Sequence, residues 1–205
     1  MTGKKPWDIF QQLQSERLHT LGAILKDVRR KALMIYDPEE GDGPWCSECT
    51  IYQRTLNTFI RYSKILPWLR IQTTGLYFVI FVDGVPIRYY KGDVEKPKKN
   101  SLNIRTEELI PHEQLCLIDP ENFNWYWRMV LIPDENRMAS EIAIAQYHDQ
   151  AETYRNLWFF DQNEISLIHL VTSSIREAAV LAPAPLGILP DFVADERDPI
   201  NGNEN

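Results

Sequence analysis

Apolar residues recur at helical spacing in the first third of the chain. Over residues 7–36 they return every three or four positions, which predicts an amphipathic helix, and Gly22 inside it predicts a weak point or a break. Glycine, proline and acidic residues dominate positions 37–44 and predict a loop. A second apolar stripe predicts a helix over residues 50–65, and Pro67 ends it.

After this proline the pattern changes to that of β-strands. Residues 76–82 are apolar on both faces, which is typical of a central strand. The dipeptide Asp83-Gly84 is a strong signal for a two-residue hairpin turn. We therefore expect residues 85–90 to return as the neighbouring strand, with Pro86 at its start, at a bulge or on an edge, because proline cannot donate to a strand ladder.

The middle of the chain contains a polar stretch followed by a clear alternation. The lysine-rich segment 92–105 predicts a loop, and residues 115–118 predict a short buried segment. Residues 123–132 alternate with period two and predict a strand. One face of that strand carries mainly large apolar side chains, which are Phe123, Trp125, Trp127, Met129 and Leu131.

The pattern of residues 141–148 leaves two assignments open. Alanine and glutamate favour a helix there, but a strand allows a hairpin into a further strand over residues 153–160, so the strand is preferred. The spacing of polar residues over 161–164 is that of a capping box and predicts a helix over about 163–181.

These elements predict the fold class and the domain organisation. We expect an α+β protein with a mostly antiparallel sheet of about six strands, covered by N-terminal helices and one C-terminal helix. Residues 1–182 form one predicted domain of ordinary size. Residues 183–205 are rich in proline and acidic residues and predict a disordered tail.

Charge and cysteine content narrow the classes of partner. The net charge is -7, so the chain lacks the global basic excess of most nucleic-acid-binding proteins. The net charge does not exclude a local basic patch. The three cysteines do not form a disulfide framework. No signal-peptide core and no run of about 18 apolar residues is present, so we expect a soluble cytoplasmic protein without a membrane partner.

Three arginines in the predicted strands form the first candidate site. Arg88, Arg128 and Arg155 each lie mid-strand, with Tyr90 and Tyr126 beside them. If the strands are neighbours in register, these side chains converge on one sheet face and suit a phosphate, carboxylate or nucleotide ligand. The alternative is a solvated sheet face on which each arginine pairs with a local acid.

Cysteines and a histidine form a weaker candidate site for zinc. Cys46 and Cys49 have the spacing of half a zinc knuckle, and His112 with Cys116 supplies the other possible pair. The two pairs are far apart in sequence, so a purely structural role of the cysteines is the better interpretation. We therefore expect no bound zinc and no other cofactor. A redox dithiol of Cys46 and Cys49 is a further alternative.

Two functions remain as hypotheses. No assembled catalytic set is recognisable, so the first is a non-enzymatic binding or regulatory protein that acts through a protein partner or as a homo-oligomer. The second is a domain that binds a small anion or nucleotide, with or without catalysis, through Arg88, Arg128 and Arg155 on the sheet face.

Overall fold

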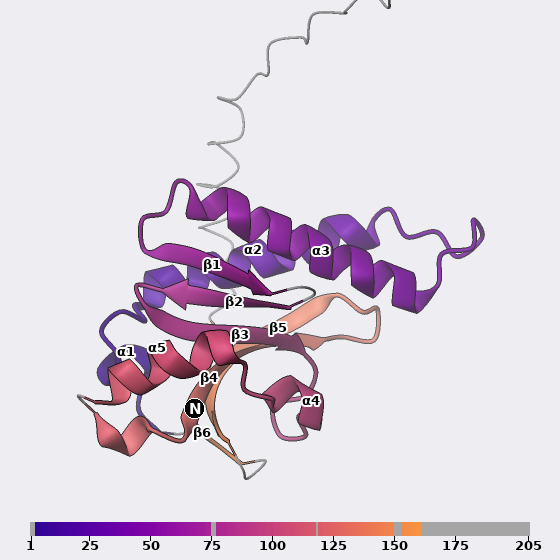
Figure 1. Cartoon of the computed structure of the whole chain (residues 1–205). Coiled ribbons are helices and arrows are strands. Elements are labelled where there is room, and N and C mark those ends of the chain that lie inside the picture. The colour runs from indigo at the N-terminus through magenta and orange to yellow at the C-terminus, as the bar shows by residue number, and fades with distance from the viewer. Residues whose placement is uncertain (1–2, 75–76, 118, 150–152, 161–205) are drawn as a thin grey trace, which may run out of the picture.

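The computed structural model describes residues 3–74, 77–117, 119–149 and 153–160. The chain folds into helices and one sheet, in an α+β arrangement (Figure 1). The predicted C-terminal helix and the predicted tail lie outside the described residues. The elements are α1 Pro6–Ile9, α2 Ser15–Leu33, α3 Pro44–Ser63, β1 Leu69–Thr74, β2 Tyr77–Val82, β3 Val85–Lys91, α4 Lys99–Leu102, α5 Thr106–Cys116, the 3-10 turn η1 Pro120–Asn122, β4 Trp125–Pro133, β5 Ala139–His148 and β6 Tyr154–Phe159.

The six strands form one mixed sheet in sequence order, β1-β2-β3-β4-β5-β6. β3 runs parallel to β4, whereas every other neighbouring pair is antiparallel. The prediction of a mostly antiparallel sheet was therefore wrong in this respect. The reason is the connection from β3 to β4, which crosses one sheet face through α4 and α5 and brings the chain back in the same direction.

Several local predictions are confirmed. The turn between β2 and β3 has φ of 49° at Asp83 and 91° at Gly84, both in the left-handed region that a two-residue hairpin of this type requires. Residues 141–148 belong to a strand, β5, and not to the alternative helix.

Three elements were not anticipated from the sequence, namely β1, α5 and α4, which falls in the predicted loop over residues 92–105. β1 carries Arg70 and Gln72, so its apolar alternation is weak. α5 contains Pro111, and proline is unfavourable inside a helix. Residues 115–118, expected to be a buried segment, include the end of α5, where Cys116 is buried but Leu117 is 83% exposed.

The first predicted helix is divided, but not at Gly22. The break falls between α1 and α2, and Gly22 lies inside α2 against the ring of Phe160. A Cβ atom at position 22 would lie 2.9 Å from Cδ1 of Phe160. Glycine is therefore used here for close packing of the helix on the chain that follows β6, and not for a turn.

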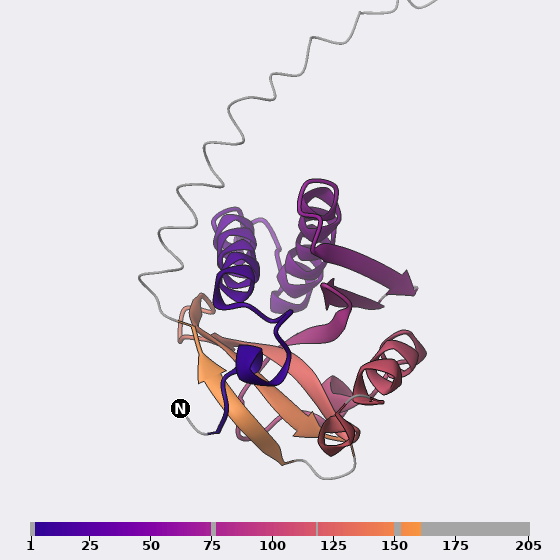
Figure 2. The same cartoon turned by 90° about the vertical axis from the view of Figure 1, so that its left-hand side faces the viewer.

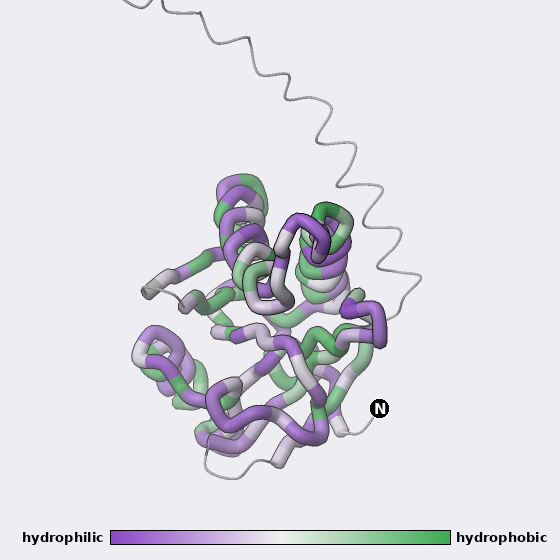
Figure 3. The backbone as a smooth tube through the Cα atoms, turned by 90° about the vertical axis from the view of Figure 1, so that its right-hand side faces the viewer, coloured by the Kyte–Doolittle hydropathy of each residue, from purple (hydrophilic) through white to green (hydrophobic). Residues whose placement is uncertain are grey.

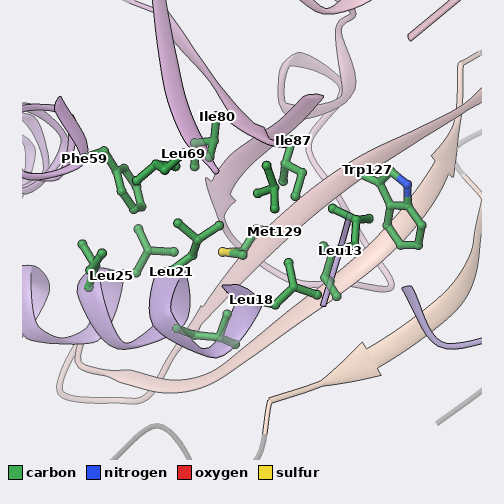
Figure 4. Packing of buried hydrophobic residues seen from close by; sticks show 14 of the residues in the cluster. Leu13, Leu18, Leu21, Leu25, Phe59, Leu69, Ile80, Ile87, Trp127 and Met129 are labelled. Carbon is green, nitrogen blue, oxygen red and sulfur yellow. The ribbon is translucent and has the colours of Figure 1, made fainter. Parts of the chain in front are cut away.

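Helices cover both faces of the sheet. α2 and α3 lie side by side on one face, and α5 lies on the other (Figure 2). Hydrophobic stretches run mainly along the strands between these helices (Figure 3). The larger core lies under α2 and α3, where Leu21 approaches Met129 and Leu25 approaches Phe59 (Figure 4). None of the helices in the described ranges has both the length and the apolar run needed to cross a bilayer.

The contact at Gly22 gives a testable prediction. We expect Gly22→Ala to destabilise the protein by about 1–3 kcal/mol, since overpacking against Phe160 outweighs the gain of about 1 kcal/mol in helix propensity. Urea unfolding measures this change. Phe160→Leu should reduce the penalty when combined with Gly22→Ala, and additive effects of the two substitutions would contradict the contact.

Candidate functional site

A buried ion pair fastens the crossover helix α5 to the sheet. Nη2 of Arg128 lies 2.8 Å from Oε1 of Glu108 and Nη1 lies 3.1 Å from Oε2, and each side chain is only 1% exposed. Arg128 also donates to the carbonyl oxygens of Trp127 and Leu102. Both terminal nitrogens of its guanidinium therefore already have acceptors within the protein, so Arg128 positions neighbouring elements.

Arg88 lies beside this pair. It is the register partner of Arg128 across the parallel β3–β4 ladder, so both side chains occupy the sheet face that α5 covers. Arg88 is 8% exposed and donates to the carbonyl oxygen of Asn103. Burial lowers the pKa of Arg88, and the charges of Arg128 and Arg105 lower it further, whereas Glu108 opposes this effect. Glu108 forms its ion pair with Arg128 and not with Arg88.

The Arg105 guanidinium belongs to the same cluster. It stacks over the ring of Tyr77 at 3.8 Å from the ring centroid. Within the described ranges, no carboxylate lies at ion-pair distance from Arg88 or Arg105. The buried Nε atoms of Arg105 and Arg128 have no hydrogen-bond acceptor among the same residues. Buried donors without acceptors are uncommon in proteins.

A cavity opens where β2 and β3 separate. The two strands pair only from Ile80↔Ile87 to Val82↔Val85, after which β3 continues along β4 and the first half of β2 stays with β1. The cavity measures about 310 Å³. It is lined by Glu48 and Tyr52 of α3, Tyr77 and Phe78 of β2, Arg88, Tyr89, Tyr90 and Lys91 of β3, and Asn100 and Ser101 of α4.

Tyr52 fills part of the space between the separated strands. Its ring centroid lies 5.2 Å from that of Phe78 and 6.2 Å from that of Tyr89. Burial raises the pKa of Tyr52, although the charge of Arg88 and a hydrogen bond from the backbone of Phe78 oppose this. The phenol is therefore neutral at physiological pH, and its hydroxyl proton can be donated to a ligand.

Glu48 is held by three cations at the rim of the cavity. Its Oε1 lies 2.7 Å from Nζ of Lys91, 2.9 Å from Nη2 of Arg29 and 3.2 Å from Nη2 of Arg137. Burial alone would raise the pKa of Glu48, but hydrogen bonds and charges from Arg29 and Lys91 outweigh it and lower the pKa to about 2. Its carboxylate is therefore ionised and committed to structural contacts.

Positive charge predominates around this cavity. Among the residues that line it, Arg88 and Lys91 are cationic and Glu48 is anionic, and Arg105 lies beside the lining residue Tyr77. The chain as a whole has a net charge of -7, so composition concealed this local excess. Such an arrangement attracts and binds anions.

The predicted tyrosines occupy different positions. Tyr90 lines the cavity, but its hydroxyl donates to Tyr147 at 2.9 Å, and burial raises its pKa to about 12. Tyr126 is buried on the face covered by α5, where its ring lies 4.2 Å from that of His112. The proposed ligand role of Tyr126 therefore stays a prediction.

Arg155 is not brought to the other two arginines. Its register partner is Gln146, which pairs with Trp127, so Arg155 lies on the face opposite Arg88 and Arg128. It donates to the side chains of Gln146 and Asn122 and stacks over Trp125. It lines a separate cavity of about 440 Å³ that also contains Lys4, Asp8 and Asp119.

Sequence reasoning missed Arg105, Tyr52 and Tyr77 as members of the cluster. Their shared signal is weak, because they come from a predicted loop, a predicted helix and a predicted strand that only the tertiary structure brings together. Lys91 is the last residue of β3 and directly precedes the lysine-rich segment 92–105.

The proposed zinc ligands remain apart. Cys46 and Cys49 are exposed in the first turns of α3, whereas His112 and Cys116 are buried in α5, with 3.5 Å between Sγ and Nε2. In the part of the chain described here, no three His, Cys, Asp or Glu side chains are grouped to hold a metal ion. Burial raises the pKa of Cys116 to about 11, which keeps it a neutral thiol.

Comparison with known proteins gives no relative. No protein-family model, curated protein or solved structure matches this chain. The function therefore has to be argued from the geometry of the cavity.

The buried pair gives a stability prediction. We expect Glu108→Gln to cost about 3–5 kcal/mol in the free energy of unfolding, because Arg128 would be left buried without its counter-charge. Chemical denaturation measures the loss. Glu113→Gln, a half-buried acid in the same helix, serves as the control and should cost less than about 1 kcal/mol. Similar values for the two variants would show that the pair does not anchor α5.

Glu48 gives a prediction of pH dependence. Its pKa falls from an ordinary 4.5 to about 2 in the folded protein, so folding favours the ionised form. This contribution is fully present above pH 4.5 and is lost as the pH falls towards 2. Urea midpoints measured across this range should therefore fall less steeply in Glu48→Gln than in the wild type. Glu40→Gln, in the exposed loop before α3, should retain the wild-type slope.

Proposed function

We propose that this protein binds a small anionic ligand, through a phosphate or carboxylate group, in the cavity between β2, β3, α3 and α4. The observation that carries the proposal is Arg88. This residue is 8% exposed, lines the cavity and lacks a carboxylate at ion-pair distance among the described residues. A buried charge without a counter-ion is costly, and an anion that enters the cavity removes this cost.

The neighbouring donors support the same ligand chemistry. Arg105, which stacks over the lining residue Tyr77, adds a second guanidinium without a carboxylate at ion-pair distance in the described ranges, and Tyr52 places a hydroxyl in the lining. Guanidinium groups form paired hydrogen bonds with phosphate and carboxylate oxygens, and hydroxyl donors complete such sites.

The lining residues favour binding over catalysis. No histidine or cysteine is among them. Glu48 is a poor general base, because its pKa is lowered to about 2 and its oxygen atoms contact Arg29, Lys91 and Arg137. General acid–base catalysis at neutral pH needs a group whose pKa lies near the working pH.

A protein partner is the second candidate function. It is favoured by three exposed apolar side chains near the loop between α2 and α3, namely Met34 at 72%, Ile35 at 59% and Trp45 at 81% exposure. Exposed large apolar side chains that lie together often mark protein-interaction surfaces. The two functions use different residues, so loss of anion binding would leave this second candidate intact.

Replacement of Arg88 tests the proposed function. We expect inorganic phosphate to raise the melting temperature of the full-length protein relative to chloride at equal ionic strength. In Arg88→Met this stabilisation should disappear, because loss of a charge-assisted fork costs about 1.5–3 kcal/mol, or at least tenfold in affinity. The ligand-free variant should be as stable as the wild type or more stable, since the repulsion between Arg88 and Arg128 is removed.

Arg155→Met is the matched control. Arg155 lines a different cavity on the opposite sheet face, so its replacement should leave the phosphate effect unchanged. Equal losses in the two variants would show that the phosphate effect does not depend on the cavity at Arg88 and would contradict the proposed site. No phosphate effect in the wild-type protein, tested together with citrate as a carboxylate, would contradict anion binding in this cavity.

A further inference from the structure

Aromatic rings surround the cationic end of the cavity. They come from Tyr52 of α3, Tyr77 and Phe78 of β2, and Tyr89 and Tyr90 of β3. A site that bound only an inorganic anion would need donors and charge but not this aromatic lining. The lining therefore indicates that the ligand has a planar or apolar part in addition to its anionic group.

Tyr77 is the ring that remains accessible to a ligand. It is 46% exposed, whereas Phe78 is 4% and Tyr90 8% exposed. The guanidinium of Arg105 covers Tyr77 at 3.8 Å from the ring centroid. This contact fixes the orientation of an exposed ring beside the arginine cluster. Fixed aromatic faces next to guanidinium groups provide a surface on which planar rings stack.

The dimensions and polar groups of the cavity limit the ligand further. A volume of about 310 Å³ lies at the lower end of small-molecule sites and suits a mononucleotide better than a dinucleotide. Asn100 and Ser101 line the side formed by α4 and supply an amide and a hydroxyl group. Such groups hydrogen-bond to sugar hydroxyls or to the edge of a heterocycle.

An extended peptide fits the site less well. Peptides that bind by strand addition need unpaired backbone groups along a strand edge. Tyr52 of α3 lies at the separated end of β2, with its ring centroid 5.2 Å from that of Phe78. The opening between β2 and β3 is thus partly closed by α3, which leaves a cavity for a compact ligand.

From these observations we infer that the ligand is a mononucleotide, with its phosphate at Arg88 and its base stacked on Tyr77. This inference rests on the proposed function, because it specifies which anion occupies the cavity. Lys91, at the rim, adds positive charge for the phosphate.

Calorimetric titration of the full-length protein tests the inference. The probes are inorganic phosphate, ribose 5-phosphate and the four ribonucleoside 5′-monophosphates. At least one nucleotide should bind about tenfold or more tightly than ribose 5-phosphate, because stacking of a base on an aromatic ring contributes on this scale. In Tyr77→Leu this difference should vanish while ribose 5-phosphate still binds, which also shows that the variant is folded.

Two further variants control for the ring. Tyr77→Phe keeps the ring and should retain the preference for the nucleotide. Phe123→Leu alters another exposed aromatic residue, 48% exposed before β4, and should have no effect. Equal binding of nucleotides and ribose 5-phosphate to the wild type would overturn the inference and leave anion binding intact. If none of the phosphate compounds bound, the inference and a phosphate ligand would both be contradicted, and citrate binding would then decide between a carboxylate ligand and no anion site.

Discussion

The buried contact between Arg128 and Glu108 is the interaction on which the rest of the site depends. Arg128 is in the middle of β4, and its guanidinium joins the carboxylate of α5 to the carbonyl oxygen of Leu102 at the end of α4. The whole connection between the two parallel strands is thereby fastened to the sheet. Each side chain is 1% exposed, so neither charge has water as an alternative partner. Loss of either residue would leave the charge of the other buried and unpaired.

The cavity follows from this arrangement of the chain. The crossover places α4 beside β3, while α3 packs on the opposite face of the sheet and contributes Tyr52. β3 is therefore committed to β4 along its second half, and β2 leaves it after three residue pairs. The opening between these strands exposes Arg88 from one face and aromatic rings from the other, a combination that a continuous ladder would keep apart.

Electrostatics links the fold to the proposed ligand. Most of the cations around the cavity are held by Glu48 and Glu108, which maintain the structure of its walls. Arg88 is buried among like charges and lacks such a partner in the described residues. The same walls that exclude water strengthen its attraction for an anion. Structure and binding thus use different members of one charged cluster.

Local pattern by itself determined α2, α3, the hairpin of β2 and β3, and the strand character of β4 and β5, because spacing along the chain records which side chains share a face. It also placed Arg88, Arg128 and Arg155 in strands, but left a common face conditional on the order and register of those strands. Only the tertiary structure decided that β3 and β4 are parallel, that Arg155 lies on the opposite face, and that Arg105 meets Tyr77. These features depend on packing and ion pairs between residues distant in sequence, whose energies leave no periodic signal in the chain.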